Sequence, residues 1–328
     1  MKKVLVVRLS SLGDVILASS VLDPLYSEGY RVDFLTFKPF GELFSGDRRV
    51  NRVIQTDRKE LSGISRIKEF ARNLGSYDYI IDLHSNPRTF LLGLFSKGKV
   101  IRYRKNAIRR RLHIFPAGKK LLKQDLSFNV VNAYGEAIKR LGISHEKFRP
   151  SIIITEDEKS RVSQILPERF IAIGAGARYP NKAYPYFPQV SKLLTESGMD
   201  VVLVGSREDR SLDRDKYPKG VLDLRGELSL RESLAVISCA EACISNDSAV
   251  AHMARAVKTP VLMIYGATSP AFGFYPFPDE GSYIYKNLEC QPCDLHGKKP
   301  CRFNTVDCLN IPPETVFQEA LNLIKNSL

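Results

Sequence analysis

The sequence predicts an α/β protein built from two doubly wound, Rossmann-like domains that face a central cleft. Short β-branched runs alternate with helical patterns, which is typical of parallel sheets with right-handed crossovers. The alternation comes in two series, and a turn-prone stretch at residues 142–150 separates them as the expected linker. With 328 residues and 44% hydrophobic composition, the chain is long enough for two buried cores.

The expected strands give domains at residues 1–148 and 149–328. Strands of the first domain are expected at residues 4–9, 32–36, 53–55, 79–83 and 100–103. Strands of the second are expected at residues 152–155, 170–174, 201–205, 242–245 and 261–265. A helix is expected over residues 126–141, and the last helix could pack back on the N-terminal domain. Since ligands of doubly wound sheets lie beyond the carboxyl ends of the strands, we expect the site in the cleft.

The positive charge of the chain is concentrated in its first half. Of the net charge of +13, all comes from residues 1–150, which hold 29 Lys and Arg against 14 Asp and Glu. This asymmetry favours an anionic partner, such as nucleic acid, phospholipid head groups or a phosphorylated glycolipid. The alternative is a solvated basic face. Without a signal-peptide pattern or an apolar run of about 20 residues, we expect a cytoplasmic protein with at most peripheral membrane contact.

A polar loop follows the first expected strand and contains Ser10, Ser11, Gly13 and Asp14. Gly13 permits a close approach, and backbone N–H groups at the start of the next helix can hold an anion. Asp14 is either the cap of that helix or a general base at the strand edge. The loop has neither the G-x-G-x-x-G pattern nor the Walker lysine pattern, which argues against ordinary dinucleotide and P-loop folds.

Two further loops follow strands of the second series. Residues 174–178 are rich in small side chains and precede Lys182, a candidate for binding pyrophosphate, although such loops are often simple turns. Asp247, Ser248 and Ala249 are expected to open a helix whose N–H groups and dipole face a phosphate, with His252 one turn further on. The alternative is a capped helix with a core histidine.

Residues 8–14, 246–252 and 265–270, with the cysteine-rich stretch after Cys290, resemble glycosyltransferase family 9, the heptosyltransferases of lipopolysaccharide core assembly. The resemblance covers essentially the whole chain. It implies a GT-B fold, an inverting reaction, an ADP-heptose donor and an anionic glycolipid acceptor, either Kdo–lipid A or a heptosylated inner core. It implies no required cofactor, and association with the inner membrane is compatible with it.

The resemblance also implies roles for individual residues. Asp14 is similar to the catalytic base, and Ser10, Ser11 and Gly13 belong to its acceptor-binding loop. Donor-binding roles are implied for eight residues. Lys182 and the helix start at Asp247, Ser248 and Ala249, with His252, would bind the donor phosphates, Glu208 would bind the ribose, and Leu228 and Leu230 would flank the adenine. For Glu208, Leu228 and Leu230 the alternative is ordinary surface and core. The family often has Gly where this chain has Ala249.

The basic half is expected to bind the acceptor. Arg88 follows the strand at residues 79–83, and Arg102 and Arg104 follow the next strand with Arg109–111 close behind. Guanidinium groups can pair with Kdo carboxylates or lipid phosphates. A solvated loop is the alternative for this cluster.

Four of the six cysteines share one loop with the spacing C-x2-C-x7-C-x6-C: Cys290, Cys293, Cys301 and Cys308. A zinc site is conceivable but not favoured, because the second pair is too widely spaced for a zinc ribbon. No Asp-x-Asp motif occurs in a suitable loop, so we expect catalysis without a metal.

Two other classes stay open. A basic nucleic-acid-binding protein would need aromatic stacking platforms or a known motif, and neither is found, so we expect no nucleic-acid partner. A GT-B transferase using another nucleotide sugar, or an epimerase acting at the same anomeric carbon, is the nearer alternative.

Overall fold

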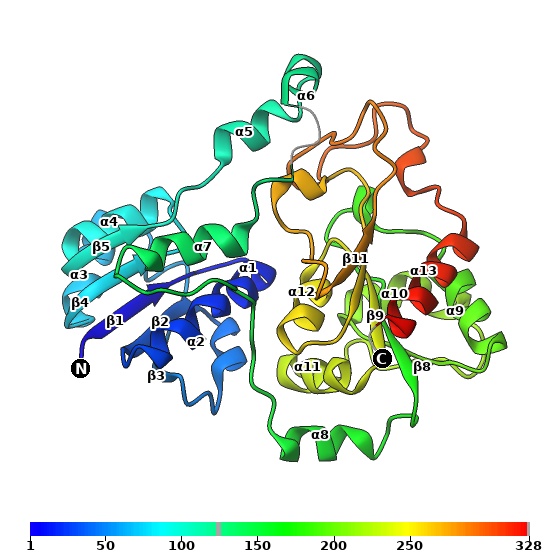
Figure 1. Ribbon diagram of the computed structural model, residues 1–328, viewed down its shortest axis with the longest axis horizontal. Helices are drawn as coiled ribbons and strands as arrows, with labels where there is room; N and C mark the ends of the chain where they lie inside the picture. The colour runs from blue at the N-terminus through cyan, green and yellow to red at the C-terminus, as the bar shows by residue number, and fades with distance from the viewer. Residues whose placement is uncertain (123–125, 327–328) are drawn as a thin grey trace. The chain divides into compact units, whose positions relative to one another are not determined.

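The computed structural model describes residues 1–122 and 126–326, and the chain divides into two compact units. The first unit comprises Met1–Lys105 and Val130–Ile153, and the second comprises Asn106–Asn129 and Ile154–Leu328. Each unit has one parallel sheet covered by helices (Figure 1). The predicted α/β fold with two Rossmann-like sheets is confirmed.

The division differs from the expected boundary between residues 148 and 149. The chain leaves the first unit after Lys105, returns to it at Val130 and leaves again after Ile153. Residues 106–129 belong to the second unit through long-range contacts: the Asn129 side chain donates to the carbonyl of Tyr275 at 3.3 Å, and the Tyr275 hydroxyl donates to the carbonyl of Leu126 at 2.5 Å. No local pattern in the sequence predicts such contacts, which is why residues 106–129 were expected in the first domain.

The sheet of the first unit has the order β3-β2-β1-β4-β5. Its strands are β1 (Lys3–Val7), β2 (Arg31–Phe37), β3 (Val50–Thr56), β4 (Ser76–Asp82) and β5 (Lys97–Arg102). Its α-helices are α1 (Leu12–Ala18), α2 (Leu22–Ser27), α3 (Ile64–Asn73), α4 (Pro87–Phe95) and α7 (Val130–Lys139). Helices α3 and α4 pack together, and α1 contacts α7. The apolar strand β1 is almost wholly buried at the centre, as its V-L-V-V run predicts.

The sheet of the second unit has the order β11-β10-β9-β6-β7-β8. Its strands are β6 (Phe170–Gly174), β7 (Asp200–Leu203), β8 (Leu222–Asp223), β9 (Ala242–Asn246), β10 (Val261–Ile264) and β11 (Gly281–Ile284). Its α-helices are α5 (Ala107–Leu112), α6 (Pro116–Leu122), α8 (Glu156–Ser163), α9 (Phe187–Glu196), α10 (Arg207–Asp213), α11 (Leu230–Cys239), α12 (Ala249–Ala256) and α13 (Pro313–Lys325). Helices α9 and α13 pack together, whereas α11 contacts both α8 and α12.

Three sequence expectations are corrected here. Residues 152–155 form no strand; they are an extended crossing between the units that ends at Thr155, the N-cap of α8. Strands β8 and β11 were not expected, because they are short edge strands whose half-buried residues give a weak apolar signal. Helix α7 begins at Val130, four residues later than expected.

The last helix packs into the core of the second unit. Val316, Ala320 and Ile324 of α13 are buried in the core of the second unit, against α9 and the strands β9 to β11. Their i, i+4 and i+8 spacing forms one apolar stripe, which the sheet beneath it covers. Across the described residues, no helix is both long enough and apolar enough to cross a bilayer.

Candidate active-site loops

Three loops of the second unit, which follow β6, β9 and β10, meet at a half-buried ion pair. Lys182 Nζ lies 2.8 Å from Asp247 Oδ2, and the Thr268 hydroxyl donates to the same carboxylate oxygen at 2.8 Å. Parallel strands bring their carboxyl ends to one edge of a sheet, which explains why residues so distant in sequence meet. The structure thus brings together Lys182 and Asp247, two of the residues singled out in the sequence.

The carboxylate of Asp247 stays ionised. Burial favours its neutral form, but the Lys182 ammonium, its hydrogen bond and the nearby His252 lower the pKa of Asp247 below its ordinary value. His252 itself is buried in α12. The ionised carboxylate holds the ammonium beside the start of α12. A fixed cation at a helix N-terminus is an arrangement suited to phosphate oxygens.

The start of α12 is not closed by its own N-cap. Ser248 stands at the N-cap position, but its side chain makes no capping hydrogen bond and lies 3.1 Å from the Ser245 hydroxyl instead. Asp247, Ser248 and Ala249 are all half-buried. The N–H groups of the first turn therefore lack the side-chain acceptor that usually satisfies them.

The small residues after β6 are fixed against β9. The Asn246 side chain donates to the carbonyl of Ala175 at 2.7 Å, and Ser245 donates to that of Gly174 at 3.1 Å. A Cβ at Gly174 would lie 2.5 Å from the Val250 side chain, so only glycine fits there without rearrangement. The glycines of this loop serve close packing between the two strands.

The loop that carries Cys290 to Cys308, called the cysteine loop below, packs beside Lys182. The sequence did not indicate this contact. The Gln291 side chain donates to the carbonyl of Gly266 at 2.6 Å, and Cys293 N donates to that of Ala267 at 2.9 Å. A Cβ at Gly297 would lie 2.6 Å from Lys182 Cγ. The sequence marked this loop by its cysteines, for which a metal site was not favoured, and did not indicate that the loop borders Lys182.

All six cysteines are free thiols, and the described residues contain no group of three or more His, Cys, Asp or Glu arranged to hold a metal ion. Cys290, Cys293 and Cys301 nevertheless lie close enough to Cys308 to affect its pKa. Burial, with the neighbouring cysteines adding to it, raises the pKa of Cys308 to about 12. Such a thiol stays protonated at neutral pH and behaves as an apolar packing group.

The residues expected near a nucleoside lie at the carboxyl side of β7 and β8. Glu208 is exposed in the first turn of α10, while Leu228 and Leu230 are half-buried around the N-cap of α11. Beside Glu208, Asp209 faces the glycine loop, because a Cβ at Gly176 would lie 2.3 Å from its Oδ2. Asp209 also closes the capping box of α10 with Ser206.

In the first unit, half-buried Asp14 forms an ion pair with buried Arg8. Arg8 Nη2 lies 2.6 Å from Asp14 Oδ1, and the hydroxyl of Ser11 donates to Oδ2 at 2.7 Å. Arg8 also donates to the carbonyl of Leu83 at 2.6 Å, which ties the ends of β1 and β4 together. Burial opposes ionisation of Asp14, but Arg8 and the Ser11 hydrogen bonds lower its pKa overall. Asp14 is thus a helix-capping residue and an anion at neutral pH. Half-buried Ser10 and buried Gly13 lie in the same turn.

A hollow of about 410 Å³ lies in the first unit and is lined by Ser85, Asn86, Pro87, Phe90 and Arg102. The Arg102 guanidinium is 4.6 Å from the centre of the exposed Phe90 ring, and its Nε is 3.4 Å from Asp82 Oδ2. A Cβ at Gly93 would lie 2.8 Å from Arg102 Nη2, so the glycine leaves room for the guanidinium. A cation beside an aromatic face suits a sugar that carries an acidic group.

The other acceptor candidates are dispersed. Arg88 donates to the carbonyl of Leu61 at 2.8 Å, its guanidinium lies 5.8 Å from the centre of the Phe37 ring, and Arg104 is exposed. Residues 109–111 lie in α5 and belong to the second unit, so they are not part of a cluster on the first unit. Arg88, Arg102 and Arg104 belong to the first unit, and their role toward an acceptor stays a prediction.

His84 is a residue that the sequence reasoning missed. Burial, followed by the charges of Arg8 and Lys105, lowers its pKa to about 3, so the imidazole is neutral at neutral pH. Its backbone N–H donates to Asp82 at 3.0 Å, directly after β4. Its place after an expected strand was the available signal.

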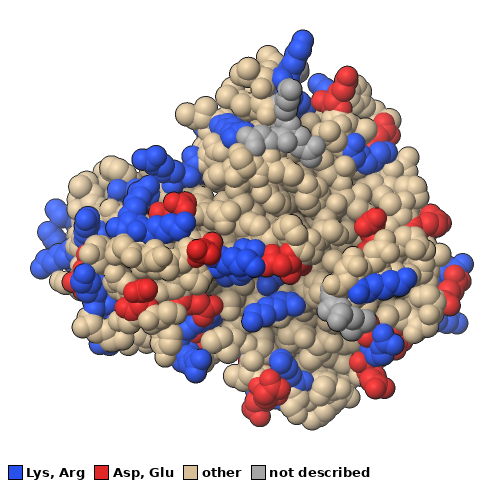
Figure 2. Space-filling model, viewed as in Figure 1, with Lys and Arg blue, Asp and Glu red and all other residues tan. Residues whose placement is uncertain are grey.

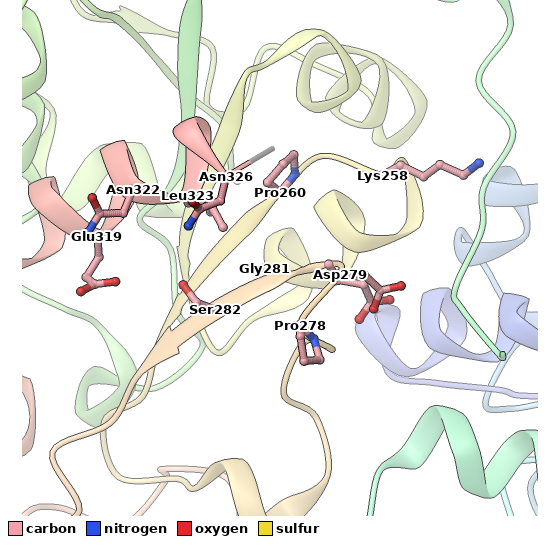
Figure 3. A pocket seen from close by; sticks show the side chains of 11 residues that line it. Lys258, Pro260, Pro278, Asp279, Gly281, Ser282, Glu319, Asn322, Leu323 and Asn326 are labelled. Carbon is pink, nitrogen blue, oxygen red and sulfur yellow. The ribbon is translucent and has the colours of Figure 1, made fainter. Parts of the chain in front are cut away.

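A second cavity, of about 430 Å³, lies at the opposite end of the second sheet. Pro260 and Gly281, at the starts of β10 and β11, line it together with Lys258, Glu319 and Asn322 (Figure 3). Lys182 and Asp247 follow the carboxyl ends of β6 and β9, so this cavity is separate from the loops around Lys182.

The model of glycosyltransferase family 9 (heptosyltransferase) matches residues 67–306, well over half of the chain. The chain belongs to glycosyltransferase family 9. Among curated relatives, the lipopolysaccharide heptosyltransferase 2 of Salmonella typhimurium is 29% identical over 137 residues, which cover 38% of this chain and 39% of that protein. The match thus spans about two fifths of the relative's length.

Two solved structures of similar fold cover nearly the whole chain. A family 9 glycosyltransferase from Veillonella parvula has a TM-score of 0.77 at 19% identity and covers 99% of this chain and 98% of that one. The E. coli ADP-heptose lipopolysaccharide heptosyltransferase II has a TM-score of 0.73 at 22% identity and covers 99% of each chain. This family 9 protein therefore shares their fold, and the sequence-based family assignment is confirmed.

Proposed function

We propose that this chain is an inverting glycosyltransferase that transfers a heptose from ADP-heptose to the inner core of lipopolysaccharide, with Kdo–lipid A or a heptosylated core as acceptor. The observation that carries the proposal is the group formed by Lys182, Asp247 and the open start of α12 in a family 9 chain. Two relatives named above are a lipopolysaccharide heptosyltransferase and an ADP-heptose lipopolysaccharide heptosyltransferase, which favours this donor and this acceptor.

On the donor side, the pyrophosphate would accept hydrogen bonds from Lys182 and from the backbone of Asp247, Ser248 and Ala249. As the bond to the anomeric carbon breaks, negative charge grows on the leaving ADP, and these fixed donors stabilise it. Glu208 is proposed to bind the ribose, and Leu228 and Leu230 to flank the adenine. His252 supports the loop from within α12 and acts on the Asp247 carboxylate.

On the acceptor side, the Asp14 carboxylate would take the proton of the acceptor hydroxyl while the oxygen attacks the anomeric carbon from the face opposite ADP. One displacement inverts the configuration at that carbon. We place the acidic sugar of the acceptor in the hollow of Phe90 and Arg102, with Ser10, Ser11, Gly13, Arg88 and Arg104 as further acceptor contacts. No metal is needed in this scheme, so activity should survive excess EDTA.

The test is calorimetric titration with ADP, UDP and GDP. We expect selective ADP binding that weakens at least about tenfold in Lys182→Ala, since one charge-assisted contact is worth about 1.5–3 kcal/mol. Lys192→Ala, on the exposed side of α9, is the matched control and should bind as the unaltered chain does. UDP selectivity would favour a different nucleotide sugar, and absence of any nucleotide binding would refute the proposal.

A further inference from the structure

Residues 106–122, which we call the α5–α6 arm, expose an unusual amount of apolar surface. Ile108 is 76% exposed, Phe115 61% and Leu121 78%, and Leu112 adds a further 40%. Of the twelve large apolar side chains that are exposed across the described residues, these four fall within 14 consecutive positions. Single exposed apolar residues are ordinary, but such a concentration marks an interaction site.

The same arm is strongly cationic. Between residues 106 and 122 the sequence holds Arg109, Arg110, Arg111, Lys119 and Lys120 and no Asp or Glu. Figure 1 shows α5 and α6 next to each other, and Figure 2 shows Lys and Arg side chains among uncharged atoms in the same region. Apolar and cationic side chains therefore share one short stretch.

The arm is anchored to the second unit, so its surface has a fixed support. Lys119 Nζ donates to the carbonyls of Glu289 at 3.0 Å and Cys290 at 2.7 Å, and the Arg110 guanidinium lies 5.8 Å from the centre of the Phe274 ring. Through Lys119, α6 contacts the cysteine loop. That loop carries a further exposed aromatic residue, Phe303, with the Arg302 guanidinium 4.8 Å from its ring centre.

We propose that the α5–α6 arm docks this protein on an anionic phospholipid bilayer. Ile108, Phe115 and Leu121 enter the interface, and the exposed cations Arg111 and Lys120 face the phosphates of the head groups. The inference rests on the proposed function in one respect, because an acceptor anchored in a membrane requires the enzyme to work at that membrane. Cations near an anionic surface favour binding to it, and the insertion of apolar side chains adds to this.

Charge alone would also suit nucleic acid, but the apolar residues decide between the two. Three of the four exposed apolar residues, Ile108, Leu112 and Leu121, are aliphatic, so Phe115 alone among the four offers a ring on which bases could stack, and stacking is the main sequence-independent contact of single strands. Insertion into a bilayer interface uses aliphatic and aromatic side chains alike.

The experiment is co-sedimentation of the full chain with vesicles of phosphatidylglycerol and phosphatidylethanolamine, compared with phosphatidylcholine vesicles. The test variant is Phe115→Ser with Leu121→Ser. The control is Ile165→Ser with Leu212→Ser, which alters two similarly exposed apolar residues of the second unit outside the arm, 54% and 76% exposed. We expect salt-sensitive binding to the anionic vesicles that falls at least about tenfold in the test variant and is unchanged in the control.

A charge variant, Arg111→Gln with Lys120→Gln, should weaken binding to anionic vesicles without altering the weak binding to phosphatidylcholine. Equal binding by the test and control variants would overturn the proposal. So would a preference for duplex DNA over vesicles that the apolar variant leaves intact. Melting temperatures of the variants show whether they remain folded.

The vesicle assay needs neither donor nor acceptor, so it is independent of the proposed reaction. A protein that binds vesicles through the arm but no ADP would refute the transferase function and leave the docking surface standing. If the Phe115→Ser, Leu121→Ser variant keeps normal ADP binding, vesicle binding and activity on membrane-bound acceptor, the docking surface is refuted and the transferase function stands.

Discussion

The two carboxylates of the candidate loops, Asp14 and Asp247, are each paired with a cation of their own unit. Arg8 and Lys182 lower the pKa of their partners, although burial acts in the opposite direction. An ionised carboxylate can accept a proton, but a lowered pKa makes it a weaker base than an ordinary aspartate. At the scale of the residue, pairing with Arg8 makes Asp14 a weaker base and at the same time fixes the position of its carboxylate.

Asp14→Asn should lower kcat by about 10²–10⁴-fold while leaving ADP affinity unchanged, because the amide cannot take a proton. Asn keeps an acceptor for Ser11, so the α1 cap should survive. Steady-state kinetics and ADP titration together test this, and full activity in the variant would exclude Asp14 as the base.

The pH dependence of kcat/KM is a second test of Asp14 as the base. Its pKa is depressed in the folded protein, so the charged form is lost only as pH falls through that lowered value. The acid limb of kcat/KM should therefore lie below about pH 4, the ordinary range of aspartate. An acid limb near pH 6 would point to a different base.

Gly297→Ala should weaken ADP binding, because the new Cβ would lie 2.6 Å from Lys182 Cγ and displace the lysine. Gly220→Ala is the matched control. It too places alanine at a positive φ, 97° against 74°, but nothing lies within 4 Å of the new Cβ. Both changes should cost about 1 kcal/mol of stability, and only Gly297→Ala should alter the calorimetric Kd. Equal affinities would separate the cysteine loop from donor binding.

At the scale of the element, charged pairs join helices that the sequence shows only as separate amphipathic patterns. Glu158 in the first turn of α8 pairs with Arg231 of α11, with Oε2 at 2.5 Å from Nη2 and Oε1 at 2.7 Å from Nε. Burial opposes ionisation, but the Arg231 hydrogen bond and charge, with Thr155, lower the pKa of Glu158 to about 2. The pair positions α8 on the second unit directly after the crossing segment.

Glu158→Gln should reduce the free energy of unfolding by about 1–2 kcal/mol at pH 7. Because the folded-state pKa is depressed, this contribution is present above the unfolded value near 4.3 and disappears as pH falls toward 2. Urea unfolding at several pH values measures it. Glu156→Gln, which alters the exposed pair with Lys159, is the control and should change stability by a few tenths of a kcal/mol.

At the scale of the whole molecule, the chain passes between its two units three times. The first unit is completed by α7 only after the chain has visited the second unit. If residues 106–129 are replaced by a flexible Gly–Ser linker of equal length, the fragment 1–153 should retain a cooperative unfolding transition, because residues 106–129 belong to the second unit. The isolated fragment 154–328 should be less stable than the full chain, since it loses the Leu126 and Asn129 contacts with Tyr275. Loss of folding in the first fragment would show that residues 106–129 do support the first unit.

Much of the fold followed from local patterns. Buried parallel strands such as β1, β6 and β10 are nearly continuous apolar runs, so their place and direction could be predicted. The edge strands β8 and β11 could not, because their residues are half-buried and too few to form a pattern. Residues 152–155 misled for the opposite reason, since β-branched residues also suit an extended connection without a strand partner.

The sequence by itself determined the family, the two Rossmann-like sheets and the loops after β1, β6, β9 and β10 as the places for chemistry. These features depend on short-range order: strand, polar turn, helix. Tertiary structure alone decided that Lys182 meets Asp247 and Thr268, that Arg8 holds Asp14, that Gly297 lies against Lys182, and that the basic arm belongs to the second unit. Each of these is a contact between residues far apart in the chain. Its energy comes from burial and from charge pairing in three dimensions, which no local spacing encodes.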